Sequence, residues 1–148
     1  MFKFFENIFS FNFNLNFNKK ENNYKVELQN EWNELKKNEL NSIKDFIKRA
    51  VEVEANTTNN YGEKGKLGYL ESVLPLNEAK KVFLFFEKLH SLCENKKIKK
   101  DFIQNLIGNE FSNILSNNVS TMISKVYKKC IYKNNFNDYE KLIKFYNF

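Results

Sequence analysis

The stretch that decides the fold runs from Ala79 to Gly108. It reads Ala79-Lys-Lys-Val-Phe-Leu-Phe-Phe-Glu-Lys-Leu-His-Ser-Leu-Cys93, then a lysine-rich break, then Ile98-Lys-Lys-Asp-Phe-Ile-Gln-Asn-Leu-Ile-Gly108. In its first half, apolar residues recur at helical spacing on more than one face, and polar residues keep only a narrow strip. A helix that is apolar over most of its circumference packs against several neighbours. We therefore predict an all-α fold, a compact bundle of about five to six helices around a central helix at 77–94.

The same stretch carries a family resemblance. Its core positions follow the pattern Val82-x-x-Phe85-Phe86-Glu87-x-Leu89-x-x-Leu92, continued by Ile98, Phe102, Ile103, Leu106 and Gly108. This pattern resembles that of a bacterial domain-of-unknown-function family of small all-helical proteins, over residues 82–108 only. The resemblance implies an acidic N-cap where this chain has Lys99, and adjacent lysines oppose the positive end of a helix dipole. It implies a helical fold and no activity.

Length and composition favour one domain. The chain has 148 residues, of which 42% are hydrophobic, and this is enough for a core of its own. The net charge is +6 and falls entirely in residues 61–148, because residues 1–60 hold nine basic and nine acidic side chains. Cys93 and Cys130 lie in apolar helical stripes, so we expect free thiols in a cytoplasmic protein. We recognise neither a secretory signal nor a membrane-spanning run of about 20 apolar residues.

Residues 1–18 read as an extended Phe/Asn-rich N-terminal arm, followed by a single helical domain at 19–148. Seven of the sixteen phenylalanines lie in the first seventeen residues. A short helix can open the arm, but apolar residues then alternate strictly with Ser or Asn. This two-residue period is typical of a strand with one apolar face. The alternating apolar residues are Phe9, Phe11, Phe13, Leu15 and Phe17.

Three placements of the arm stay open. It can lie over the protein's own core, pair as a strand with a second copy or a partner, or insert into a membrane interface. Lys3 is the only basic residue before Lys19, and interfacial anchors usually carry more positive charge. We expect a protein partner or self-association through the arm.

The rest of the domain reads as helices and short connections. We predict one long helix at 23–55 that can break near Asn38–Asn41, and a main loop at 56–68. Residues 67–74 form one or two helical turns stopped by Pro75. Asn77 caps the central helix, helices follow at 99–108 and 118–133, and Asn137-x-x-Glu140 opens the last helix as a capping box.

Two lysine clusters are the candidate charged surfaces. They are Lys96, Lys97, Lys99 and Lys100, and Lys125, Lys128, Lys129 and Lys133. Such surfaces can meet the phosphates of nucleic acid or of anionic lipid. Specific base reading favours arginine, however, and Arg49 is the only one in the chain. A host preference for A- and T-rich codons, together with solubility, is the favoured explanation for the lysines.

Catalytic and metal-binding sets are not recognisable. His90 is the only histidine, and Cys93 is the only cysteine near it in sequence. We therefore predict no catalytic residues, metal or cofactor, and interpret the chain as a non-catalytic interaction or scaffold protein. The alternatives are a weak, non-specific binder of nucleic acid or anionic membrane surfaces through the lysine clusters, and an enzyme using His90 and Cys93.

Overall fold

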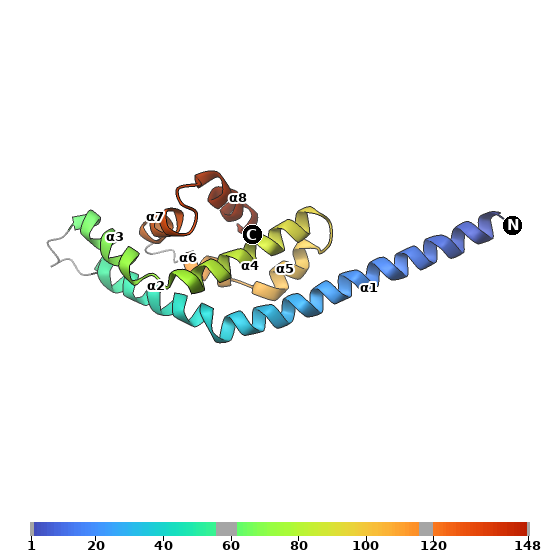
Figure 1. Ribbon diagram of the computed structural model, residues 1–148, viewed down its shortest axis with the longest axis horizontal. Coiled ribbons are helices and arrows are strands. Elements are labelled where there is room, and N and C mark those ends of the chain that lie inside the picture. Colours follow the sequence, from blue (N-terminus) through green and yellow to red (C-terminus); the bar gives the residue numbers. More distant parts are fainter. Residues whose placement is uncertain (1, 56–61, 116–119, 148) are drawn as a thin grey trace.

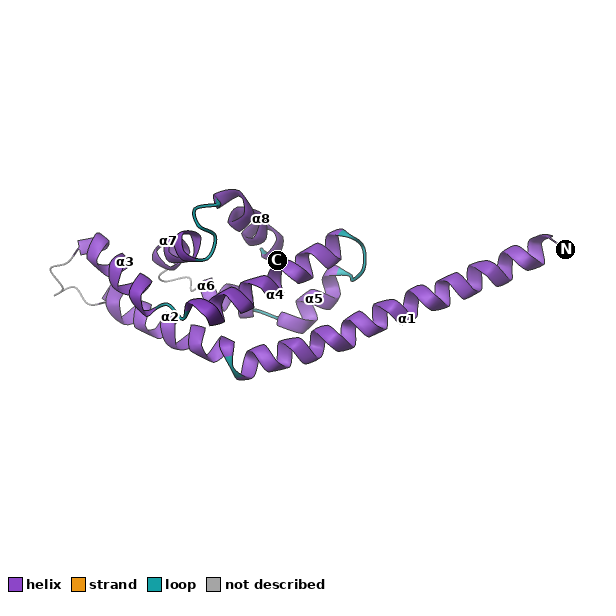
Figure 2. Cartoon of the chain, viewed as in Figure 1, coloured by secondary structure: helices purple, strands orange, loops and turns teal. Residues whose placement is uncertain are grey.

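The computed structural model describes residues 2–55, 62–115 and 120–147, and the side chains of 20–55, 62–115 and 121–147. These residues form eight α-helices and no strand, which confirms the all-α class (Figures 1 and 2). The helices are α1 (Phe2–Lys37), α2 (Glu39–Ala55), α3 (Gly62–Val73), α4 (Leu76–Glu94), α5 (Lys100–Ile107), α6 (Glu110–Leu115), α7 (Ser120–Cys130) and α8 (Phe136–Tyr146).

The core forms around α4, as predicted. Six of its apolar residues face several directions and are at most 1% exposed: Ala79, Val82, Phe83, Phe85, Phe86 and Leu89. Neighbours of α4 include α1, α2 and α8. Leu76 and Leu84 are its exposed large apolar side chains, at 37% and 62%.

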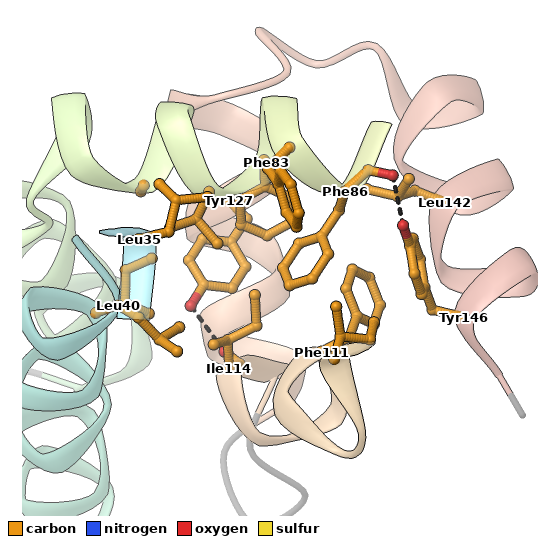
Figure 3. Packing of buried hydrophobic residues seen from close by; sticks show 14 of the residues in the cluster. Leu35, Leu40, Phe83, Phe86, Phe111, Ile114, Tyr127, Leu142 and Tyr146 are labelled. Atoms are coloured by element: carbon orange, nitrogen blue, oxygen red, sulfur yellow. Dashed lines mark hydrogen bonds between the residues drawn. The ribbon is translucent and has the colours of Figure 1, made fainter. Parts of the chain in front are cut away.

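Aromatic rings fill the space between α4 and the C-terminal helices (Figure 3). Phe83 meets Tyr127 edge to face with ring centroids 4.9 Å apart, and Phe86 meets Phe111 in the same way at 5.0 Å. Tyr127 also donates a hydrogen bond of 2.7 Å to the carbonyl of Ile114. These contacts join α4 to α6 and α7 and use the ring edges and faces that favour such geometry.

The long N-terminal helix breaks at Asn38, within the predicted interval. The Asn38 side-chain amide donates to the Glu34 carbonyl at 3.2 Å, and Asn41 donates to the Lys37 carbonyl at 2.8 Å. Each amide therefore satisfies a carbonyl near the end of α1, where helical partners run out. Leu35 and Leu40 are buried on either side of the break, so both helices face the same core.

The strand predicted within the N-terminal arm was wrong, whereas a helix at the start of the arm was among the predictions. Residues 2–18 continue α1 as helix, and the backbone projects past the body instead of folding back over the core (Figure 1). A lone strand would leave its backbone groups unpaired, whereas a helix pairs them within itself. The side chains of the predicted arm residues Phe9, Phe11, Phe13, Leu15 and Phe17 lie outside the described ones.

Several predicted helix starts also move. α3 already begins at Gly62, so the described part of the predicted 56–68 loop, residues 62–68, is helical, while 56–61 and the predicted cap Asn118 lie outside the described residues. α4 begins one residue after Pro75 and has no side-chain cap, so Asn77 is inside the helix. The cap of α8 is Asn135, whose side chain accepts from the Asp138 amide at 3.5 Å, and not Asn137.

The count of five to six helices was also too low. Besides the break at Asn38, α5 ends at Gly108, which adopts a positive φ of 54°. Left-handed backbone of this kind is readily adopted by glycine and stops a helix. Both breaks lie where a helix end was considered, near Asn38–Asn41 and at 108, but helical periodicity continues across them, so the apolar pattern did not settle whether each separates two helices.

Candidate functional site

The first lysine cluster forms the turn between α4 and α5. All four of its lysines are exposed: Lys96, Lys97, Lys99 and Lys100. Ile98, in their midst, is only 3% exposed and anchors the turn in the core. The Lys100 ammonium lies 5.2 Å from the centroid of the Phe145 ring. The turn is thus a fixed basic projection of the body.

The second lysine cluster lies on and after α7, and its charges are largely paired. Lys125 contacts Glu63 at 2.6 Å, Lys128 contacts Glu140 at 2.8 Å, and Lys129 contacts Glu71 at 3.1 Å. The glutamates come from α3 and α8. The hydrogen bond and charge of Lys125 hold the pKa of Glu63 below its usual value. Lys133 follows α7 in a left-handed conformation, with φ at 50°.

The two clusters do not form one surface. The α4–α5 turn and α7 lie at separate places along the length of the molecule (Figure 1). The sequence grouped the lysines correctly within each cluster but could not show that α3 and α8 bring glutamates to α7.

A groove of about 700 Å³ opens beside α7. It lies where α3, α7 and the start of α8 meet. It is lined by Lys64, Leu67, Gly68, Glu71, Lys125, Lys128, Lys129, Asn134 and Phe136. The sequence analysis identified three of these residues, Lys125, Lys128 and Lys129. It missed the α3 wall, because helical spacing within α3 gives no sign of which helix it faces.

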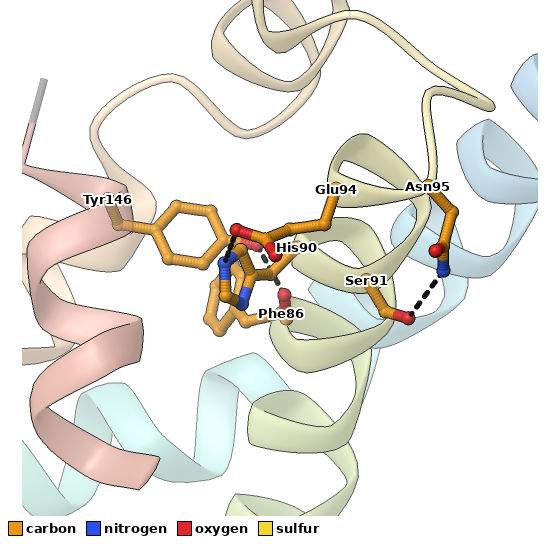
Figure 4. Close-up of polar contacts among 6 residues, drawn as sticks. All are labelled: Phe86, His90, Ser91, Glu94, Asn95 and Tyr146. Carbon is orange, nitrogen blue, oxygen red and sulfur yellow. Dashed lines mark hydrogen bonds and ion pairs between the residues drawn. The ribbon is translucent and has the colours of Figure 1, made fainter. Parts of the chain in front are cut away.

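His90 contacts Glu94 on its own helix (Figure 4) and Phe145 on α8. Its Nε2 lies 3.1 Å from Glu94 Oε1, and its ring centroid lies 4.4 Å from that of Phe145. Cys93 is half-buried, as is Cys130, and burial raises the pKa of the Cys130 thiol. A raised pKa lowers the fraction of thiolate, the reactive form of cysteine.

Within the described ranges, no group of three or more His, Cys, Asp or Glu side chains is arranged to hold a metal ion. The same part of the chain has no helix with the length and apolarity to cross a bilayer.

A smaller depression of about 320 Å³ lies between α4 and the α7–α8 connection. Lys80, Leu84 and Glu87 line one side of it, and Tyr132 and Asp138 the other. The Tyr132 hydroxyl is buried without a hydrogen-bond partner among the described residues. Burial, and then the charge of Glu87, raise its pKa. Because solvent does not reach this oxygen, it does not offer a ligand contact.

The fold and the two basic surfaces define an all-α protein with a projecting N-terminal helix. No protein-family model matches this chain, and neither a curated protein nor a solved structure matches it. The resemblance of residues 82–108 to a family of small helical proteins therefore stays a prediction, and function has to be argued from the residues themselves.

Proposed function

We propose that this protein is a non-catalytic interaction or scaffold protein whose N-terminal arm binds another protein chain. The supporting observation is the course of α1, a helix of 36 residues. Among its described side chains, the first buried one is Leu28, followed by Trp32 and Leu35. The part that holds the core is therefore the C-terminal third, and the arm projects beyond it (Figure 1).

Composition supports an association role for the projecting part. Seven phenylalanines in seventeen residues are far more than a solvated helix needs. Burying one phenylalanine against a partner contributes about 1.5–3 kcal/mol, so a few of them suffice for a stable contact. Apolar surface at this density marks sites of association. The partner that buries these phenylalanines can be a second copy of the chain or a different protein.

The test compares the full chain with three variants. One starts at Lys19, one replaces Phe9, Phe11, Phe13 and Phe17 by alanine, and the matched control replaces Asn12, Asn14, Asn16 and Asn18 by alanine. We expect the first two to lose self-association in light scattering, or partner capture in a pull-down from the native host, while the asparagine variant keeps them. Equal masses and equal capture for all four chains would refute the proposal.

A second candidate function is weak binding to anionic surfaces through the α4–α5 turn. It is favoured by four exposed lysines at a turn that Ile98 fixes in place. Binding of DNA, RNA and anionic liposomes should be non-specific and should fall steeply with salt. Replacing Lys96, Lys97 and Lys99 by glutamine should abolish it, and the absence of binding at low salt would exclude this function.

A further inference from the structure

The groove between α3, α7 and the start of α8 has the dimensions of a small-molecule site. Its volume of about 700 Å³ lies inside the range of roughly 300–1,000 Å³ usual for ligand pockets. Three separate segments contribute to its walls. It is independent of the N-terminal arm and of the α4–α5 turn.

The charge of the groove favours an anionic ligand. Lysines make up four of its lining residues, against one glutamate: Lys64, Lys125, Lys128, Lys129 and Glu71. The side chains of Lys125 and Lys129 are 51% and 60% exposed, so their ion pairs with Glu63 and Glu71 are solvated. Solvated pairs contribute little to stability, and an incoming anion can therefore compete for the lysines.

Lys128 is held more firmly than its neighbours. Its side chain is only 24% exposed and contacts Glu140 at 2.8 Å. Its ammonium also lies over the rings of Phe136 and Tyr139, 5.4 and 5.3 Å from their centroids. This places a fixed positive charge beside Phe136, whose ring is 53% exposed at the groove. A ligand with both an anionic group and a ring has partners for each.

Gly68 leaves room on the α3 wall. It lies in the interior of α3, where glycine is unfavourable relative to alanine. Neither packing nor backbone conformation requires it, because a Cβ at this position would meet nothing within 4 Å and its φ is not positive. The α3 wall of the groove is therefore open at Gly68.

We propose that this groove binds a small phosphorylated ligand that carries an aromatic ring, the chemistry of a nucleotide. Its phosphates lie between Lys125 and Lys129 and displace Glu63 and Glu71. Its ring stacks on Phe136. Charge-assisted hydrogen bonds from lysine to phosphate supply the affinity, and stacking on an exposed aromatic face supplies the preference for a ring.

Calorimetric titration of the full chain separates the parts of this proposal. The probes are ADP, inorganic pyrophosphate, adenosine and a single-stranded oligonucleotide. We expect ADP to bind most tightly, pyrophosphate more weakly, and adenosine weakest. Equal affinity for pyrophosphate and ADP would overturn the role of Phe136. Tighter binding of the oligonucleotide than of ADP would overturn the small ligand in favour of a nucleic-acid surface.

Single substitutions in the groove should change the affinity for ADP in opposite directions. Lys129→Gln should weaken ADP binding about tenfold, the scale of one charge-assisted hydrogen bond. Glu71→Gln frees Lys129 and should strengthen ADP binding about threefold, the scale of an exposed ion pair. Gly68→Ala should raise the melting temperature and weaken binding. Lys36→Gln, at an exposed position of α1 outside the groove, is the matched control and should change nothing.

Two results would reject the site itself. One is the absence of saturable binding of ADP and pyrophosphate. The other is an equal effect of Lys36→Gln and Lys129→Gln, which would indicate general attraction to a basic protein. Circular dichroism of each variant shows that it is folded, and the gain expected for Glu71→Gln does not arise from misfolding. Neither result depends on the N-terminal arm. The groove can therefore be rejected while association through the arm stands, and the reverse.

Discussion

The indole of Trp32 in α1 lies parallel to the ring of Phe85 in α4, with ring centroids 5.5 Å apart and planes 9° apart. The same indole meets Phe86 at 5.9 Å in a tilted arrangement. All three side chains are at most 1% exposed. The Lys88–Glu31 ion pair, at 2.8 Å, joins the same two helices outside the core. These contacts fix the direction in which α1 leaves the body.

Replacing Trp32 by alanine should lower the free energy of unfolding by about 3–5 kcal/mol, because it removes a fully buried aromatic side chain and leaves a cavity between α1 and α4. Urea denaturation followed by circular dichroism measures this loss. Val26→Ala is the control on the same helix, since Val26 is 60% exposed and should change little. Equal effects of the two substitutions would mean that α1 does not pack as described.

Tyr127→Phe should lower the free energy of unfolding by about 1–2 kcal/mol. The hydroxyl donates to the Ile114 carbonyl in the core, and its loss leaves a buried acceptor without a partner. The ring contacts with Phe83 remain, so the cost is that of the hydrogen bond alone. Tyr69→Phe is the matched control, because Tyr69 is 44% exposed. Denaturant unfolding measures the stability of both variants. An unchanged midpoint for Tyr127→Phe would contradict the hydrogen bond.

The protein should unfold at alkaline pH. Burial raises the pKa of Tyr139 to about 12, and burial likewise raises the pKa values of Tyr127, Tyr132 and Tyr146. An unfolded tyrosine has a pKa near 10, so above about pH 10 the unfolded chain loses protons that the folded one keeps. Stability is complete below this pH and falls above it by about 1.4 kcal/mol per pH unit for each tyrosine.

Phenolate absorbance and circular dichroism, recorded together from neutral to alkaline pH, test this expectation. These four tyrosines should ionise together with the loss of helical signal. Ionisation of all tyrosines near pH 10 in a protein that stays helical would show that these hydroxyls are not buried.

Asn135→Ala should destabilise the protein by about 1 kcal/mol, because Asn135 caps α8 through the Asp138 amide. The side-chain amide of Asn135 also donates to the Asp138 carboxylate at 2.8 Å. Asn137→Ala is the decisive comparison, since the sequence pattern favours Asn137 as the cap and the structure places it inside the first turn. Thermal melts of both variants should show a lower midpoint for Asn135→Ala only. A lower midpoint for Asn137→Ala only would instead support the predicted capping box at Asn137-x-x-Glu140.

Local sequence patterns predicted the central helix of the core better than they predicted where the helices begin. Apolar residues on several faces of α4 identified it as the central helix, because a helix of this kind packs against several neighbours. The break at Asn38 was within the predicted interval. The starts of α3, α4 and α8 were displaced. Near α8, Asn135 and Asn137 both have the chemistry of a cap and only backbone conformation selects between them, whereas α4 begins directly after Pro75 without a side-chain cap.

The candidate sites divide in the same way. The lysines of the α4–α5 turn and of α7 could be recognised as clusters because each lies within a short segment. The partners of Lys125 and Lys129 lie 62 and 58 residues away, and no spacing rule reaches so far. The groove was missed for the same reason, because Gly68 and Phe136 meet α7 only in the folded chain.

By itself, the order of residues determined the helical class, the central position of α4 and the residues that form the core, because each of these follows from the periodicity of one segment. Only the tertiary structure decided that the aromatic N-terminus continues α1 as a helix away from the body, that α3 and α8 supply counter-charges to α7, and that a groove lies between them. These features depend on which helix faces meet, and packing between distant segments sets that.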